Sequence, residues 1–244
     1  MKLLEFLGVP MHAGTMDETV SLIADRLEAR EFTQHVVVNV AKLVHMKRDR
    51  ALAESVQACD VINIDGMGVV WGARMLGHDV PERVAGIDLF CRLLEAAAHQ
   101  CWPVYLLGAT DAVVSKTVEL VTKNYPGLRV AGYANGYFWD DEEAAVTAIR
   151  NSGARLLFVA ITSPKKETFI ERWKNQLGVD FVMGVGGTFD VIAGKVRRAP
   201  VWMQRCGLEW LFRVSQEPNR MWKRYLVTNA QFAVMLAKAY LARR

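Results

Sequence analysis

The sequence lacks the features that define several common classes of protein. Its four cysteines are scattered and form no CxxC or CxH pair, which argues against a disulfide scaffold or a zinc site and fits a reducing cytoplasm. No apolar run approaches the roughly 20 residues that a membrane-spanning helix requires. The apolar N-terminal stretch contains Lys2 and Glu5, which makes it a poor signal peptide. With no GxxxxGKS, GxxxxGKT or complete GxGxxG motif, neither a P-loop nor a classical dinucleotide site is expected.

The chain is rich in apolar residues, and its charge is unevenly distributed. Apolar residues make up 52% of the 244 residues, enough to bury a core without disulfides or metals. Residues 195–244 hold eleven Lys and Arg but only two Asp and Glu, a net charge of +9, whereas residues 1–194 carry a net charge of −5. Three of the seven tryptophans also lie in residues 195–244. A basic, Trp-rich end favours an anionic partner such as a phosphate, a nucleic acid or a lipid surface.

Short apolar runs alternate with amphipathic stretches along residues 1–194. This alternation predicts a layered α/β domain with a mostly parallel sheet. Residues 195–244 are expected to add a basic helical appendage, with helices at 201–214 and 217–241 that are separated near Pro218. The expected strands are 3–9, 35–39, 60–64, 103–107, 128–133, 155–161 and 180–185. The expected helices of the domain are 16–30, 41–58, 67–77, 86–100, 111–125, 141–152 and 165–177.

Polar residues and glycines follow several of the expected strands. Asn39 ends one strand, Asp65 directly follows the next, and Gly108 and the stretch Gly184–Gly187 end two others. In parallel sheets, ligands bind beyond the carboxyl ends of the strands. These residues are therefore expected at one edge of the sheet, where a ligand site is predicted.

Two charged residues near this edge are candidates for chemistry. Asp65 follows an apolar strand, where a carboxylate can act as a general base, hold a ribose or a metal, or simply cap the next helix. Arg83 lies in the block PERVAGIDL together with Glu82 and Asp88. Its guanidinium can bind a phosphate or a carboxylate, or form a structural ion pair with one of these neighbours.

Glycine turns and a lysine give weaker indications. Gly108 in LLGAT and Gly186 in GVGGTFD can cradle a sugar nucleotide through backbone amides, although tight turn geometry explains each of them taken alone. Lys166 is expected in the first turn of a helix that begins at Pro164, where a cation opposes the helix dipole. This placement suggests a ligand role for Lys166, while a solvated lysine is the plainer interpretation.

The appendage contains three arginines that can converge on a diphosphate. Arg220 and Arg224 are one helical turn apart, and Arg213 precedes them on the other expected helix. Trp, Leu and Met residues interleaved with the arginines also fit an interfacial amphipathic element. The alternative is an ordinary packed pair of helices, but the net charge of this region favours anion binding.

Several long motifs together resemble the WecG/TagA/CpsF family of bacterial glycosyltransferases. They cover nearly the whole chain in order, and the blocks containing DGMGVVW, ERVAGIDL and RAPVWMQ…GLEW are specific. The matching segments are VNVAKLVHM (38–46), INIDGMGVVWGAR (62–74), PERVAGIDL (81–89), YLLGA (105–109), GVGGTFDVIAGKVRRAPVWMQRCGLEWLFR (184–213) and QEPNRMWKRYL (216–226).

The resemblance implies a Rossmann-like α/β glycosyltransferase core over 1–194 and a C-terminal appendage over 195–244 that binds a membrane and a diphosphate. It implies inverting transfer of a sugar from a UDP-sugar to an undecaprenyl-diphosphate-linked saccharide, at the inner face of the bacterial cell membrane. Such a transfer would serve surface-polysaccharide synthesis. Neither a metal nor a cofactor is expected, and a homo-oligomer is a further expectation.

The family's site residues carry over to specific positions of this chain. Asp65 matches the proposed catalytic base, Asn39 and Arg83 match pocket residues, and Arg213, Arg220 and Arg224 match arginines thought to hold the diphosphate. Val37 and Lys166 depart from the family, which usually shows Thr and Gln at these positions. The departures leave the donor sugar open between N-acetylmannosamine, a uronic acid and a hexose.

Two other classes of function remain from the residues alone. One is a non-catalytic module that binds a nucleotide or a lipid, and the other is a nucleic-acid binder that uses the basic end. Release of UDP that depends on the acceptor would favour the enzyme, whereas salt-sensitive retention of an oligonucleotide would favour the nucleic-acid binder. Among the three functions, we expect the glycosyltransferase, and we expect no nucleic-acid partner.

Overall fold

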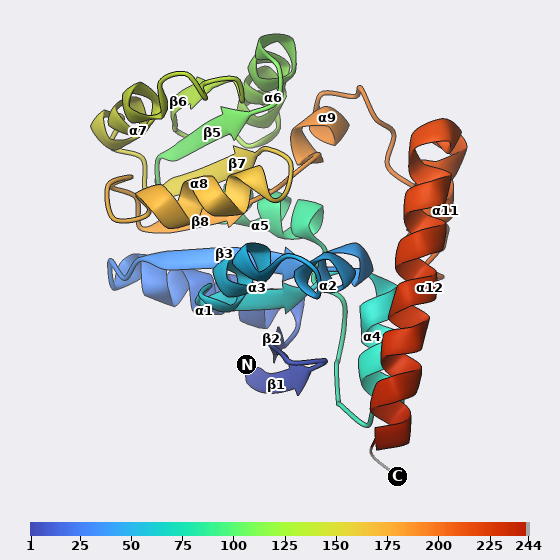
Figure 1. The fold of residues 1–244 in the computed structure, drawn as a ribbon. Helices are drawn as coiled ribbons and strands as arrows, with labels where there is room; N and C mark the ends of the chain where they lie inside the picture. Colours follow the sequence, from blue (N-terminus) through green and yellow to red (C-terminus); the bar gives the residue numbers. More distant parts are fainter. Residues whose placement is uncertain (243–244) are drawn as a thin grey trace.

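The computed structural model describes residues 1–242, and it shows an eight-stranded sheet with helices on both faces (Figure 1). The strand order is β1-β2-β4-β3-β8-β7-β5-β6, in which β1 is antiparallel to β2 and every other neighbouring pair is parallel. This arrangement confirms the α/β class with a mostly parallel sheet. The strands are β1 (Lys2–Phe6), β2 (Val9–Ala13), β3 (Thr33–Val38), β4 (Val61–Ile64), β5 (Val104–Gly108), β6 (Val130–Ala134), β7 (Leu156–Ala160) and β8 (Phe181–Gly184).

The helices form two layers and a C-terminal group. On one face of the sheet, the side chains of α1, α5 and α6 pack into one core cluster with β5, β7 and β8. On the other face, α2 and α3 pack over the first half of the sheet, and α7 and α8 pack over the second half. The helices are α1 (Met16–Glu28), α2 (Val40–Met46), α3 (Arg50–Gln57), α4 (Met67–Met75), α5 (Gly86–His99), α6 (Asp111–Asn124), α7 (Glu142–Asn151), α8 (Lys165–Trp173), α9 (Thr188–Ile192), α10 (Val201–Arg205), α11 (Glu209–Gln216) and α12 (Pro218–Ala242).

Three expected elements are each divided in two. The run at 3–9 is a hairpin, because the chain turns at Leu7 and Gly8 and Phe6 pairs with Val9. The helix expected at 41–58 breaks near Asp49, whose carboxylate accepts a hydrogen bond from the backbone N–H of Leu52 at 3.0 Å and so starts a new helix. The helix expected at 201–214 is likewise interrupted, and α10 and α11 take its place.

The C-terminal appendage packs on the domain through α12. Figure 1 shows α12 running beside α4 and α2. Phe232 of α12 is buried in the same core cluster as β4, α2 and α4, and Leu236 packs against that cluster. Gly72 of α4 leaves room for them, since a Cβ there would lie 2.9 Å from Cδ2 of Leu236. The appendage therefore contributes apolar side chains to the core of the domain. None of the helices within 1–242 is long and apolar enough to cross a membrane.

The carboxyl ends of the parallel strands share one edge of the sheet, which we call the carboxyl edge. β3 and β4 are neighbours in parallel register, with Val38 opposite Ile64, so Asn39 and Asp65 leave the sheet side by side. After β3 the chain passes to the face of the sheet covered by α2 and α3, whereas after β8 it passes to the opposite face, where Phe189 of α9 packs. In doubly wound sheets such a point is where a crevice for ligands opens. The fold thus places Asn39 and Asp65 next to a predicted ligand crevice.

Candidate active site at the carboxyl edge

Asp65 is fixed by the strand that precedes it and by the loop that follows α4. Its backbone N–H donates to the carbonyl of Val38 at 2.9 Å, which extends the β3–β4 ladder by one residue. The N–H of Val84 donates to the carbonyl of Ile64, also at 2.9 Å, and this bond brings the loop containing Arg83 against the end of β4. The side chains of Asp65 and Arg83 therefore approach each other at the carboxyl edge.

Charged residues from three parts of the chain surround Asp65. Arg83 donates from Nη1 to Oε2 of Glu209, the first residue of α11, at 2.8 Å. Arg213 lies on the same helix one turn later, close enough to act electrostatically on Asp65. We call these residues, together with Asp88 and its partner Arg198, the carboxyl-edge network. The two oxygens of Asp88 accept from Nη1 and Nη2 of Arg198 at 2.6 Å each, a fork that fixes the start of the appendage to α5.

The network has three carboxylates and three guanidinium groups, and several of these charges modulate the effect of burial on the pKa of Asp65. Burial raises the pKa of Asp65 to about 6. The guanidinium groups of Arg83 and Arg213 oppose this rise, while the carboxylates of Glu209 and Asp88 reinforce it. A carboxylate with a pKa near the operating pH is suited to accept a proton during a reaction. The raised pKa therefore makes Asp65 a candidate proton acceptor at this edge.

Asn39 has a structural task at the same edge. Its side-chain oxygen accepts from the backbone N–H of Lys42 at 3.0 Å and caps α2. It also borders the turn after Asp65, because a Cβ on Gly66 would lie 3.9 Å from Cβ of Asn39. Its amide group, which is partly exposed, is therefore available at the rim beside Asp65.

Lys166 is buried, and its ammonium group is paired. Lys166 and Lys42 both donate to Oε1 of Glu167, at 2.6 and 2.9 Å, and so join α8, which follows β7, to α2, which follows β3. Burial and the nearby Lys42 charge lower the pKa of Lys166 to about 8. Burial alone would raise the pKa of Glu167, but the two lysines hold it at about 2. This triad carries one excess positive charge beside Gly184, the last residue of β8.

The remaining predicted site residues are spread along the edge and the appendage. Gly108 ends β5, four strands away from β4 and thus about 19 Å from it, with φ of 130° and the backbone of Ala160 against its α-carbon. Gly186 follows β8, two strands away from β4, and has open space beside its α-carbon. Arg224 is exposed on α12, and the side chain of Arg220 lies outside the described residues. The structure thus brings together Asp65, Arg83, Arg213 and Asn39, but not Gly108.

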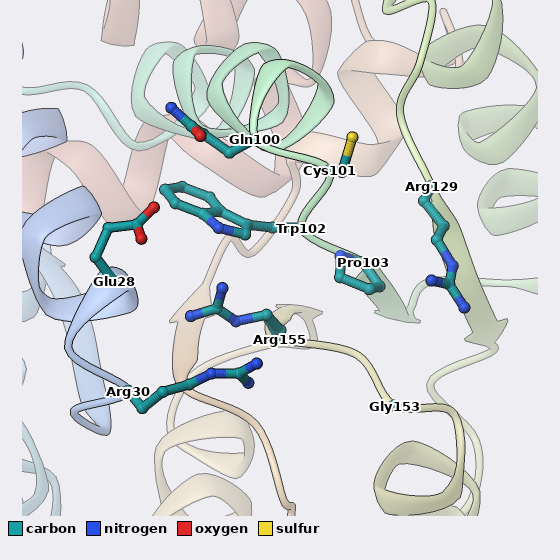
Figure 2. Close-up of a pocket in the computed structure, with 9 residues that line it drawn as sticks. All are labelled: Glu28, Arg30, Gln100, Cys101, Trp102, Pro103, Arg129, Gly153 and Arg155. Carbon is teal, nitrogen blue, oxygen red and sulfur yellow. The ribbon is translucent and has the colours of Figure 1, made fainter.

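A second group of arginines lines a cavity of about 460 Å³ at the opposite edge of the sheet (Figure 2). We call it the amino-edge cavity. In the view of Figure 2, Arg30 and Arg155 lie below the ring of Trp102, and Arg129 lies beyond Pro103. Because these residues precede the strands, they are separated from Asp65 by the length of the sheet. No sequence argument singled out this cavity.

Sequence reasoning also missed the acidic partners of the arginines. Arg83 pairs with Glu209, 126 residues later, rather than with its neighbour Glu82 or Asp88. Glu209 left one signal, since it is one of only two acidic residues in the basic appendage. Nothing in the sequence indicated Lys42 or Arg198, because a single lysine or arginine on a helix or in a loop is common and does not point to a particular partner.

The fold is that of an α/β protein with a mostly parallel sheet, a class that binds ligands beyond the carboxyl ends of its strands, and here a carboxylate lies among arginines at that edge. Residues 4–244 match the model of the family described as "Glycosyl transferase WecG/TagA/CpsF family". The chain belongs to this family, as its motifs predicted.

Two curated relatives are identical to this chain at more than a third of the aligned positions. The chain is 38% identical over 169 residues to a protein of Bacillus spizizenii, a match that covers 69% of this chain and 65% of the relative. It is 35% identical over 179 residues to a protein of Bacillus subtilis (strain 168), covering 73% of this chain and 69% of the relative. The chain thus matches about two thirds of the length of these relatives. Both are named "N-acetylglucosaminyldiphosphoundecaprenol N-acetyl-beta-D-mannosaminyltransferase".

Proposed function

We propose that this protein is an inverting glycosyltransferase that moves a sugar from a UDP-sugar to an undecaprenyl-diphosphate-linked saccharide. The observation that carries the proposal is Asp65, a carboxylate at the carboxyl edge with a pKa near 6, flanked by guanidinium groups of Arg83 and Arg213. Membership of a glycosyltransferase family supports the reaction class. The printed names of the two relatives support a lipid-diphosphate acceptor.

The reaction needs one base and a means to neutralise the leaving group. Asp65 takes the proton of the acceptor hydroxyl, whose oxygen forms a bond to the anomeric carbon of the donor. The bond from that carbon to the UDP oxygen breaks, and UDP leaves with the electron pair. Attack on the face opposite to UDP inverts the configuration. The positive charges of Arg213, Arg220 and Arg224 offset the charge that develops on the diphosphate.

The donor pocket is assigned to the crevice between β3 and β8. Asn39 borders it on one side, and Gly186 and the buried Lys166 border it on the other. The excess positive charge of the Lys42–Glu167–Lys166 triad favours a donor with an anionic group, either its diphosphate or a uronic acid. We propose an N-acetylmannosamine-like sugar, its uronic acid or a hexose as the sugar that is transferred.

The appendage is proposed to hold the protein on the inner face of the cell membrane, where a lipid-linked acceptor resides. Ten of the sixteen exposed large apolar side chains among the described residues lie in the appendage, among them Trp202, Trp222 and Leu241. Apolar side chains beside Lys and Arg suit an interface with anionic lipids. Sedimentation with vesicles that contain an anionic lipid would test this, because added salt should weaken binding.

A panel of UDP-sugars incubated with an undecaprenyl-diphosphate-linked N-acetylglucosamine acceptor tests the proposed reaction. We expect UDP release from one donor that depends on the acceptor and continues in the presence of EDTA. Omission of the acceptor is the matched control, since it leaves only hydrolysis. UDP-sugar binding without any acceptor-dependent release would instead favour a non-catalytic binding module. Retention of an oligonucleotide that weakens with salt would favour a nucleic-acid binder.

A further inference from the structure

The ion pair between Arg83 and Glu209 joins the domain to the appendage beside the proposed base. Arg83 lies in the loop before α5, and Glu209 begins α11. Their nitrogen and oxygen are 2.8 Å apart, and the side chains are only 12% and 23% exposed. Moving both charges out of water costs free energy that a surface pair would not cost. An otherwise basic appendage thus presents one of its two acidic residues at this partly buried position.

The charged groups around Asp65 suggest what the carboxylate of Glu209 does beside it. The charged groups that act on Asp65 are Arg83 from the loop, Asp88 from α5, and Glu209 and Arg213 from α11. Asp88 is held by Arg198, so its charge is largely offset. Glu209 is the partner of Arg83, so without it the charge of Arg83 beside Asp65 would have no paired carboxylate. An unpaired Arg83 together with Arg213 would lower the pKa of Asp65 and make it a weaker base, although burial would still oppose the decrease.

We propose that Glu209 is a positioning residue that orients Arg83 and offsets its charge beside Asp65, so that Asp65 remains able to accept a proton. The inference rests on the proposed function, in which Asp65 is the base. Arg83 retains its remaining N–H groups for an anionic substrate, because Glu209 occupies only Nη1. In this arrangement the appendage supplies a carboxylate to the base as well as guanidinium groups to the leaving group.

A purely structural latch would predict something different. If Glu209 only fastened the appendage, its removal would weaken docking and lower kcat/KM without moving the pH at which Asp65 titrates. The proposal predicts that the titration itself moves, because removing a negative charge next to Asp65 favours its ionised form. Titration of Asp65 therefore separates the two roles.

The experiment follows the carboxyl carbon of Asp65 by NMR in full-length protein labelled with carbon-13 at aspartate. The signal absent in Asp65→Asn identifies the residue. We expect a midpoint of about 6 in the unchanged protein, and a midpoint lower by about 0.5–1 pH unit in Glu209→Gln. Glu209→Asp keeps the charge and should restore the midpoint to near its original value. Glu54→Gln is the matched control, since Glu54 forms an exposed pair with Arg50, and it should leave the midpoint unchanged.

A midpoint unchanged in Glu209→Gln would overturn the inference. If that variant did not fold, Arg83→Gln would decide, because loss of the opposing guanidinium should raise the midpoint of Asp65, and an unmoved midpoint would again overturn it. In the transfer assay, the acid limb of kcat/KM in Glu209→Gln should move by the same amount as the NMR midpoint. Absence of transfer in the unchanged protein would refute the proposed function, whereas the NMR midpoints would still decide whether Glu209 controls the proton affinity of Asp65.

Discussion

Arginines gather at both edges of the sheet, and they meet different partners at each. At the amino-edge cavity, Arg155 donates from Nε to Asp180 at 2.5 Å, donates to the carbonyl of Leu27, and lies over the ring of Trp102 (Figure 2). Arg30 shares the same Asp180 at 3.1 Å. In the carboxyl-edge network, by contrast, Arg83 and Arg213 act on an acid whose pKa is raised. The arginines of the two edges therefore have different partners and different electrostatic effects.

The C-terminal ends of two helices explain why arginines at the amino edge have structural partners. The C-terminal ends of α1 and α5 lie at the amino-edge cavity, which Glu28 and Gln100 help to line. Unpaired carbonyls at such ends carry partial negative charge, which a guanidinium stabilises. Arg155 donates to one of the carbonyls at the end of α1, that of Leu27, which also accepts from the backbone N–H of Arg30 at 3.1 Å. We therefore interpret the arginines of the amino edge as structural and those of the carboxyl edge as functional.

The largest effect expected from this comparison is at Asp65. Asp65→Asn keeps the shape of the side chain but cannot accept the proton, so kcat should fall by about 100-fold or more. UDP-sugar affinity, measured by calorimetry, should change little. Asp180→Asn, at the amino edge, should leave kcat of the folded protein within about twofold of its original value. A near-normal kcat in Asp65→Asn would remove Asp65 from the role of base.

The same substitution should make the fold more stable, and the gain should depend on pH. The fold raises the pKa of Asp65 from 3.8 to about 6 and so favours the protonated form. Stability from this group is fully present below pH 3.8 and is lost as the pH rises through about 6. Asn resembles the protonated form, so Asp65→Asn should gain up to about 3 kcal/mol at pH 8 and nothing near pH 3.5. Urea unfolding at both pH values measures this.

The exposed Asp140 provides the matched control for that measurement. Asp140→Asn should change the free energy of unfolding by less than about 0.5 kcal/mol at either pH. An equal gain for Asp65→Asn at both pH values would contradict a raised pKa as its cause.

The sequence predicted the edge of the sheet on which Asn39 and Asp65 lie, but not the pairing within the carboxyl-edge network. Strand ends are local features, and Asn39 and Asp65 were placed correctly because neighbouring parallel strands end together. The partners of Arg83 and Asp88 lie 126 and 110 residues away in the appendage. Such contacts depend on how α11 and the preceding loop pack, which no local pattern reports. The break at Asp49 was missed for the opposite reason, since one capping side chain overrode a continuous helical pattern.

The smallest expected effects test the comparison most directly, because one arginine from each edge is removed. Arg155→Ala should lower the free energy of unfolding by roughly 1.5–3 kcal/mol, since a largely buried charge-assisted hydrogen bond to Asp180 is lost, and leave kcat/KM of the folded enzyme unchanged. Arg213→Ala, at an exposed position, should lower kcat/KM by roughly 10- to 100-fold and leave stability within about 0.5 kcal/mol. Urea unfolding gives the free energy of unfolding of each variant, and transfer kinetics give its kcat/KM. If Arg155→Ala also reduced transfer as much as Arg213→Ala does, the amino-edge cavity would have to communicate with Asp65, and the division between a structural and a functional edge would fail.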